Sequence, residues 1–225
     1  MSRPIVVLCA ALLALAGCGS GDDDEAAGTA TATPASTATE AGCERVKAPE
    51  PKGEADLAKP RKKLEPGKTY VATVATSCGD FRIRLDVKRA PKTAASFAYL
   101  ADKGLYDGTT FHRVVPGFVI QGGDPEGDGT GGPGYAVVEA PPRDLSYTRG
   151  VVAMAKTGTE PPGTSGSQFF VVTAEDAQLP PQYALLGQVV EGEEAVDRIA
   201  ASETDPGNER PVDPIVIRSV DVAEQ

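Results

Sequence analysis

The sequence predicts a mainly β fold, a closed antiparallel barrel capped by two α-helices. Many short apolar runs of strand length are separated by turns rich in glycine and proline, of which the chain has 25 and 19. Two longer segments have the apolar spacing of amphipathic helices. Hydrophobic residues make up 40% of the 225 residues, which is enough for one core. We therefore expect one domain with a tail.

The first segment, residues 1–18, is predicted to be a signal peptide. Arg3 supplies a positive charge, and an apolar run over 5–16 follows that is too short to span a bilayer. A buried core helix is the alternative. The residues from Leu15 to Cys18 resemble the lipobox of bacterial lipoproteins. This resemblance implies that Cys18 is lipidated and that the protein is extracytoplasmic, anchored to the cell membrane by its N-terminal lipid.

Residues 19–65 are predicted to form a disordered tether. They contain an acidic cluster at 22–25, a Thr/Ala-rich stretch and a Lys/Glu/Pro-rich stretch, without a usable hydrophobic period. Such a composition cannot bury enough apolar surface to order itself.

Four cysteines have different expected fates. Cys9 lies in the signal peptide, and Cys18 is the expected lipidation site. Cys43 and Cys78 remain as a pair in an exported protein, where oxidation is permitted. A disulfide between them would join the end of the tether to the first strand, and two unpaired thiols are the alternative.

The domain over 66–225 begins with a predicted hairpin. Residues 69–77 and 81–85 alternate as strands do, and a Cys-Gly-Asp turn joins them. Pro91 then opens a helix that ends near Gly104. The remaining strands are expected over 111–115, 118–121, 151–155, 168–173, 185–190 and 215–222, and the second helix over 193–201.

Charge and histidine content exclude several classes of function. The 22 Lys and Arg against 32 Asp and Glu give a net charge of −10, which argues against a nucleic-acid partner. The chain has a single histidine, His112, so two-histidine metal motifs are excluded. We expect no metal and no cofactor.

One motif carries most of the functional information. Residues 111–124 read FHRVVPGFVIQGGD and closely resemble the active-site signature of cyclophilin-type peptidyl-prolyl cis-trans isomerases. The resemblance covers about residues 67–225. Other segments resemble the family's further signatures in the same order, namely 90–93, 129–132, 150–155 and 166–171. The family resemblance implies an eight-stranded cyclophilin barrel and an enzyme that acts, as a monomer, on X–Pro bonds of proline-containing polypeptides, here those of exported proteins.

The chemistry of X–Pro isomerisation explains the residue types. Rotation about the bond crosses a barrier of roughly 18–20 kcal/mol, because amide resonance must be broken. Twisting localises a lone pair on the prolyl nitrogen, and a fixed donor aimed there stabilises the transition state. Arginine is always charged and carries several donors in a rigid fork. The family resemblance assigns this role to Arg113, with Gln121 holding the arginine or the substrate carbonyl. Taken alone, Arg113 would be read as a partner in a surface salt bridge, and the motif around it favours the catalytic role.

The same resemblance assigns residues to the substrate. Phe118, Val119, Phe170 and Leu179 would line an apolar cup for the proline ring, with Tyr183 at its rim. Phe118 and Phe170 could also be ordinary core residues. The positions that would contact the peptide before the proline are Thr130, Ala155, Lys156 and Gln168, with backbone groups of Ala155 and Lys156 pairing with it.

Two points qualify the resemblance. His112 adjoins Arg113, but neighbouring strand residues point to opposite faces, so we expect His112 to be a structural or rim residue. Gln178 stands where the family has a tryptophan tied to cyclosporin binding, which puts drug sensitivity in doubt.

A module that binds proline segments with little turnover, or a tethered holdase, is the alternative function.

Overall fold

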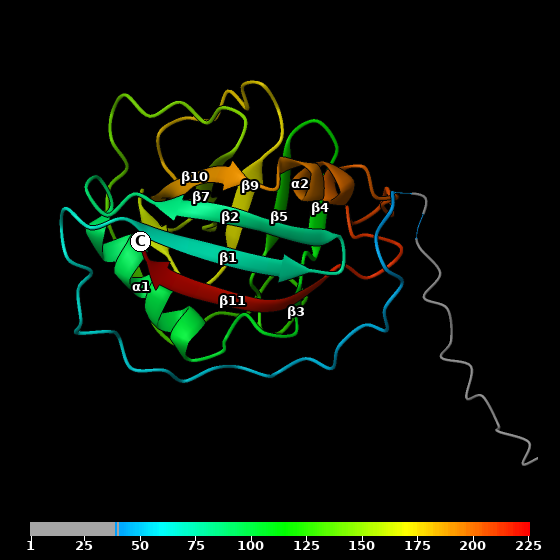
Figure 1. The fold of residues 1–225 in the computed structure, drawn as a ribbon, viewed down its shortest axis with the longest axis horizontal. Helices are drawn as coiled ribbons and strands as arrows, with labels where there is room; N and C mark the ends of the chain where they lie inside the picture. The colour runs from blue at the N-terminus through cyan, green and yellow to red at the C-terminus, as the bar shows by residue number, and fades with distance from the viewer. Residues whose placement is uncertain (1–38, 40) are drawn as a thin grey trace, which may run out of the picture. The chain divides into compact units, whose positions relative to one another are not determined.

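The computed structural model describes residue 39 and residues 41–225 (Figure 1). The predicted signal peptide, Cys18 and most of the tether before residue 41 lie outside the described residues. Within the described part of the chain, no helix combines the length and hydrophobicity needed to cross a membrane.

A nine-stranded antiparallel sheet dominates the domain, in the order β3-β11-β1-β2-β10-β7-β9-β5-β4, and a second sheet pairs β6 with β8. The strands are β1 (Tyr70–Thr76), β2 (Gly79–Leu85), β3 (Thr109–Thr110), β4 (Arg113–Val115), β5 (Val119–Gly122), β6 (Val137–Val138), β7 (Val151–Met154), β8 (Thr164–Ser165), β9 (Phe169–Val172), β10 (Leu185–Glu191) and β11 (Val216–Glu224). The strands expected from the sequence are present, whereas the two-residue strands β3, β6 and β8 were not expected.

The large sheet is an open, curled half-barrel, so the predicted closed eight-stranded barrel is wrong. Its two edge strands, β3 and β4, are consecutive in the chain and only two and three residues long. They do not pair with each other. The Val114 N–H of β4 instead donates to the Glu209 carbonyl at 2.8 Å, and the Phe111 N–H between the two strands donates to the Ile215 carbonyl at 2.9 Å. Backbone N–H groups that could have paired β3 with β4 and closed the barrel are therefore hydrogen-bonded to other parts of the chain.

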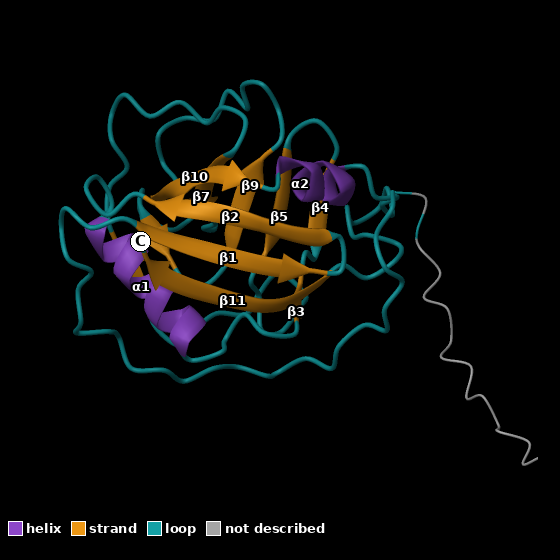
Figure 2. Cartoon of the chain, in the orientation of Figure 1, coloured by secondary structure: helices purple, strands orange, loops and turns teal. Residues whose placement is uncertain are grey.

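The two helices lie at opposite ends of the curled sheet (Figures 1 and 2). Helix α1 (Pro91–Asp102) begins at a proline, which suits the first helical position. The Glu139 carboxylate accepts hydrogen bonds from the Lys92 and Thr93 N–H groups at 3.1 and 2.8 Å. Helix α2 (Glu193–Ala200) follows Gly192, whose φ of 78° favours glycine. Any Cβ at this position would lie 2.3 Å from the Asp80 carbonyl oxygen, so the close approach also requires glycine.

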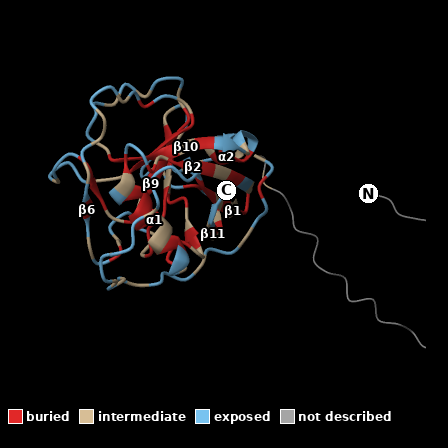
Figure 3. Cartoon of the chain, turned by 60° about the vertical axis from the view of Figure 1, so that its left-hand side comes forward, coloured by how far each residue is buried: buried red, intermediate tan, exposed pale blue. Residues whose placement is uncertain are grey.

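The main core fills the interior of the half-barrel. Phe97 of α1 packs against Tyr106 and Phe169, with ring centroids 4.8 and 5.7 Å apart. Buried residues follow the strands, and exposed residues are concentrated on the loops (Figure 3). In β2, every second side chain points into this core, namely Phe81, Ile83 and Leu85, as the sequence predicted.

Residues 41–65, which we call the strap, differ from the disordered tether expected over 19–65. The strap has no helix or strand, but its backbone bonds to the domain: Glu44 N–H to the Ser77 carbonyl, Lys52 N–H to the Pro125 carbonyl and Leu57 N–H to the Pro133 carbonyl, at 2.7 to 2.9 Å. A disulfide joins Cys43 to Cys78, and both half-cystines are buried. The domain surface and the covalent link thus supply the order that the strap's own composition cannot.

Candidate active site

The register of four neighbouring strands places three of the predicted site residues, Arg113, Gln121 and Phe170, in one row with Ala153. Arg113 of β4 is opposite Gln121 of β5, Gln121 is opposite Phe170 of β9, and Phe170 is opposite Ala153 of β7. Residues that pair across a sheet lie on the same face. The row therefore forms one continuous strip across β4, β5, β9 and β7.

The strip begins with a chain of polar contacts. Arg113 Nε donates to Glu209 Oε2 at 2.6 Å, and Arg113 Nη1 lies 3.5 Å from Gln121 Oε1. Gln121 Nε2 donates to Gln168 Oε1 at 3.0 Å. Gln168 Nε2 in turn donates to the carbonyls of Gly129 and Gly131, both at 2.9 Å. The donors of Arg113 are thus oriented by a network that reaches from loop to loop across two strands.

An apolar cluster adjoins these polar groups. Val119 and Phe170 are buried in a small second core, and Phe118, Leu179 and Tyr183 pack against it while partly exposed. The Phe170 and Tyr183 rings meet edge to face, with centroids 5.4 Å apart. The structure thus brings together the five residues that the sequence assigned to the cup.

Tyr147 is a member of the same cluster that the sequence reasoning missed. Its hydroxyl donates to the Tyr183 carbonyl at 2.7 Å and accepts the Tyr183 N–H at 3.0 Å. Burial raises the pKa of Tyr147 to about 12, so the hydroxyl stays protonated and able to donate. Tyr147 thus holds the backbone of the rim residue Tyr183 through two hydrogen bonds, and no local motif in the sequence marks it.

A groove of about 710 Å³ lies beside the polar chain and is lined in part by Gln121 and Gln168. Its lining includes the four residues that were expected to contact the peptide before the proline, Thr130, Ala155, Lys156 and Gln168, together with Gln121. One backbone group of Ala155 is already paired within the protein. The Ala155 N–H already donates to the Gln168 carbonyl at 2.9 Å, because the chain after β7 continues its pairing with the residue before β9. This N–H is therefore engaged within the protein.

Lys156 and Gln178 flank the site from two loops. Lys156 Nζ donates to the Thr157 and Glu160 carbonyls and lies 5.7 Å from the centre of the Tyr183 ring. Gln178 is exposed, with a left-handed φ of 52°. Its N–H donates to Asp176 Oδ1.

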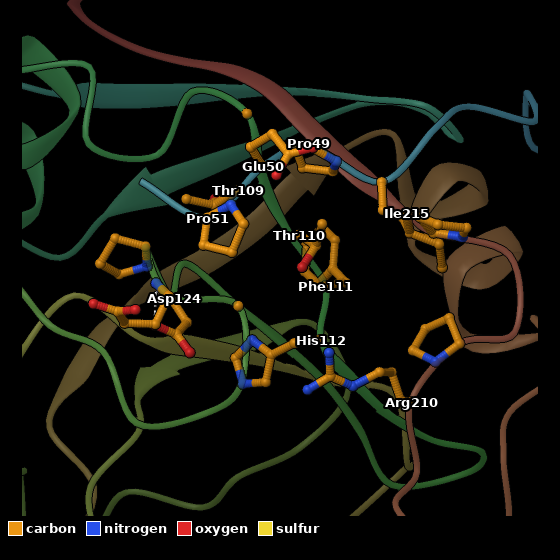
Figure 4. A pocket seen from close by; sticks show the side chains of 17 residues that line it. Pro49, Glu50, Pro51, Thr109, Thr110, Phe111, His112, Asp124, Arg210 and Ile215 are labelled. Atoms are coloured by element: carbon orange, nitrogen blue, oxygen red, sulfur yellow. Dashed lines mark hydrogen bonds between the residues drawn. The ribbon is translucent and has the colours of Figure 1, made fainter. Parts of the chain in front are cut away.

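His112 faces a different space from Arg113. Its side chain is buried and lines a separate cavity of about 190 Å³, together with Asp124, Arg210 and the strap residue Glu50 (Figure 4). Burial lowers the pKa of His112, and Asp124 only partly opposes this. The two neighbours therefore face different spaces, as the sequence predicted, although His112 lies just before β4 and not within a strand.

Glu209 is the second residue that the sequence reasoning missed. It lies about a hundred residues after Arg113 in a loop between α2 and β11, and its ion pair with Arg113 comes from the tertiary fold. The turn-forming residues around it predict a loop, but nothing in their pattern indicates which strand the loop approaches.

Comparison with known proteins identifies the family. The family model described as cyclophilin-type peptidyl-prolyl cis-trans isomerase/CLD matches residues 71–222. The chain is 44% identical to peptidyl-prolyl cis-trans isomerase B of Streptomyces anulatus over 167 residues, covering 66% of this chain and 94% of the relative. It is 39% identical to peptidyl-prolyl cis-trans isomerase A of Mycobacterium tuberculosis over 173 residues, covering 69% and 93%.

Solved structures agree with the fold. A crystal structure of a Cryptosporidium parvum cyclophilin-type isomerase has a TM-score of 0.64 at 33% identity, covering 70% of this chain and 99% of that one. A second structure of that protein, in the presence of the dipeptide Ala-Pro, has a TM-score of 0.64 at 31% identity, covering 69% and 99%. The matched family pattern and the nearly full coverage of these relatives show that the chain belongs to the cyclophilin-type peptidyl-prolyl cis-trans isomerases.

Proposed function

We propose that this protein isomerises X–Pro bonds of exported polypeptides, with Arg113 as the donor to the prolyl nitrogen. The observation that carries the proposal is the strip in which Arg113, Gln121 and Phe170 lie opposite one another on β4, β5 and β9. It sets a charged donor beside an apolar cup of the kind that a proline ring needs.

The mechanism requires only binding and orientation. The cup formed with Phe118, Val119 and Phe170 holds the ring, and the amide twists while the ring stays fixed. The guanidinium of Arg113 donates to the nitrogen lone pair that appears as resonance is lost. Because this contact is absent in both planar forms, it stabilises the transition state selectively. The 710 Å³ groove has room for the residues before the proline.

The test is exchange spectroscopy by NMR on an Ala-Pro peptide, with wild type and Arg113→Ala. We expect kcat/KM to fall by at least about 100-fold, the scale of losing one preorganised donor. Arg89→Ala is the matched control, since Arg89 also donates from Nε to a carboxylate at 2.6 Å, but beside α1. Near-wild-type exchange in Arg113→Ala would refute the mechanism. Peptide binding without catalysis by the wild type would support the alternative of a binding module.

We further propose that Cys18 carries a lipid that anchors the protein outside the cytoplasm. The support is the sequence from Leu15 to Cys18 and the long segment before the strap. Cys18→Ser should lose incorporation of radiolabelled palmitate and leave the membrane fraction, whereas Cys9→Ser should keep both. Label on the Cys18→Ser protein would refute the assignment.

A further inference from the structure

The loop that carries Glu209 contacts Arg113 and also hydrogen-bonds to the edge strand β4. Strand β4 lies at one end of the sheet order and pairs only with β5. On its other side, the Val114 N–H donates to the Glu209 carbonyl at 2.8 Å. The backbone of Glu209 is therefore bonded to the residue that follows Arg113, while its side chain reaches Arg113 Nε at 2.6 Å.

The backbone of Glu209 adopts a conformation that side chains rarely take. Its φ is 59°, and only Gln178 shares a positive φ among the described residues other than glycine. Left-handed backbone at a residue with a Cβ costs free energy and persists where the surroundings impose it. At Glu209 this conformation lets the carbonyl and the carboxylate meet β4 together.

Hydrogen bonds within the loop hold this conformation. Asp205 accepts the Glu209 N–H on its carbonyl at 2.8 Å and the Gly207 N–H on its carboxylate at 2.7 Å. The Asp205 N–H donates to the Arg210 carbonyl at 2.9 Å, and the Arg210 N–H donates to Asn208 Oδ1 at 3.0 Å. These hydrogen bonds preorganise the loop, so the Glu209 carboxylate is held in place beside Arg113.

We propose that Glu209 is a positioning residue that fixes the guanidinium of Arg113 for catalysis, an inference that rests on the proposed role of Arg113. The arginine has a long flexible stem, and its side chain is 34% exposed. Its contact with Gln121 is long, at 3.5 Å. The charge-assisted bond to Glu209 is the short one. It occupies Nε and leaves the Nη donors to the substrate. A guanidinium held in one orientation loses less freedom in the transition state.

Glycine is the informative substitution, because it tolerates the left-handed backbone that alanine would strain. We expect Glu209→Gly to fold and to lower kcat/KM about 10-fold, less than loss of the donor itself. The loss should fall on kcat with KM nearly unchanged, since the interaction matters in the transition state. Glu209→Gln keeps an oxygen that accepts from Nε and should restore most of the activity. Glu191→Ala, which breaks the Arg82 ion pair on β2 and β10, should leave kcat unchanged.

Two further measurements exclude a merely structural role. The NMR signal of the Arg113 Nε–H should be slow to exchange with solvent in the wild type and in Glu209→Gln, and fast in Glu209→Gly. In the Arg113→Ala background, Glu209→Gly should have no additional effect on kcat, because its effect passes through the guanidinium.

The outcomes separate the two proposals. If Arg113→Ala loses activity while Glu209→Gly keeps it, the positioning role is refuted and the proposed function stands. An equal loss from Glu209→Gly with and without Arg113 also refutes it. If Arg113→Ala is fully active, the proposed mechanism itself fails.

Discussion

The two faces of β4, β5 and β9 serve different purposes. On the face toward the main core lie Val114, Ile120 and Val171, each fully buried. On the other face lie Arg113, Gln121 and Phe170, of which Gln121 lines the groove and Phe170 belongs to the second core. The same backbone ladder positions both sets, so a rigid core on one side fixes the spacing of functional groups on the other. Substitutions on the first face should therefore change stability, and those on the second should change activity.

The core face should show the largest effect. Ile120→Ala removes a fully buried side chain next to Gln121 in the chain, and we expect the free energy of unfolding to fall by about 2–5 kcal/mol. Urea denaturation measures this, and kcat/KM per folded molecule should stay near the wild-type value. Lost activity at unchanged stability would contradict the division between the faces.

Removing the disulfide should lower stability, as a substitution on the core face does. Cys43 and Cys78 belong to the main core cluster and are 35 residues apart in the chain. Replacing both by alanine should lower stability by about 2–4 kcal/mol, because the unfolded chain gains freedom. The oxidised protein should also be lighter than the reduced protein by two hydrogens in intact-mass spectrometry. Two alkylatable thiols in the freshly purified oxidised protein would show that the bond is absent.

A substitution in the strip should have a smaller effect, and it should lower activity while leaving stability almost unchanged. Gln121→Ala removes the link between Arg113 and Gln168, and we expect kcat/KM to fall about 10-fold, part of the loss for a whole donor. The urea midpoint should barely move, since Gln121 is only partly buried. A change in stability as large as that of Ile120→Ala would show that the strip is structural.

His112 offers the mildest test, through pH. Its pKa is lowered from the ordinary 6.5 by burial first, with Asp124 raising it and Arg210 and Arg113 lowering it further. The unfolded chain therefore binds the proton more readily. The stability that neutral His112 contributes is present above pH 6.5 and is lost as pH falls toward the lower folded value.

The corresponding measurement is the free energy of unfolding between pH 5 and 7. The slope due to His112 cannot exceed about 1.4 kcal/mol per pH unit. Because the chain has one histidine, His112→Gln should flatten the curve in this window. Identical curves for the two proteins would contradict a lowered pKa.

The sequence by itself determined the elements that depend on local pattern. Alternation in 69–77 and 81–85 predicted the hairpin of β1 and β2, and Pro91 marked the start of α1. The segment 111–124 indicated the family and predicted that His112 and Arg113 face different spaces. These features are encoded in neighbouring residues, so no knowledge of distant contacts is needed.

Only the tertiary structure decided the features that depend on distant segments. The half-barrel stays open because β4 bonds to the loop of Glu209 and not to β3, which no local pattern announces. The strap is ordered by backbone bonds and a disulfide to the domain, although its composition indicated disorder. Glu209 likewise meets Arg113 across 96 positions of sequence. In each case the deciding interaction joins residues far apart in the chain, and its free energy exists only once the fold brings them together.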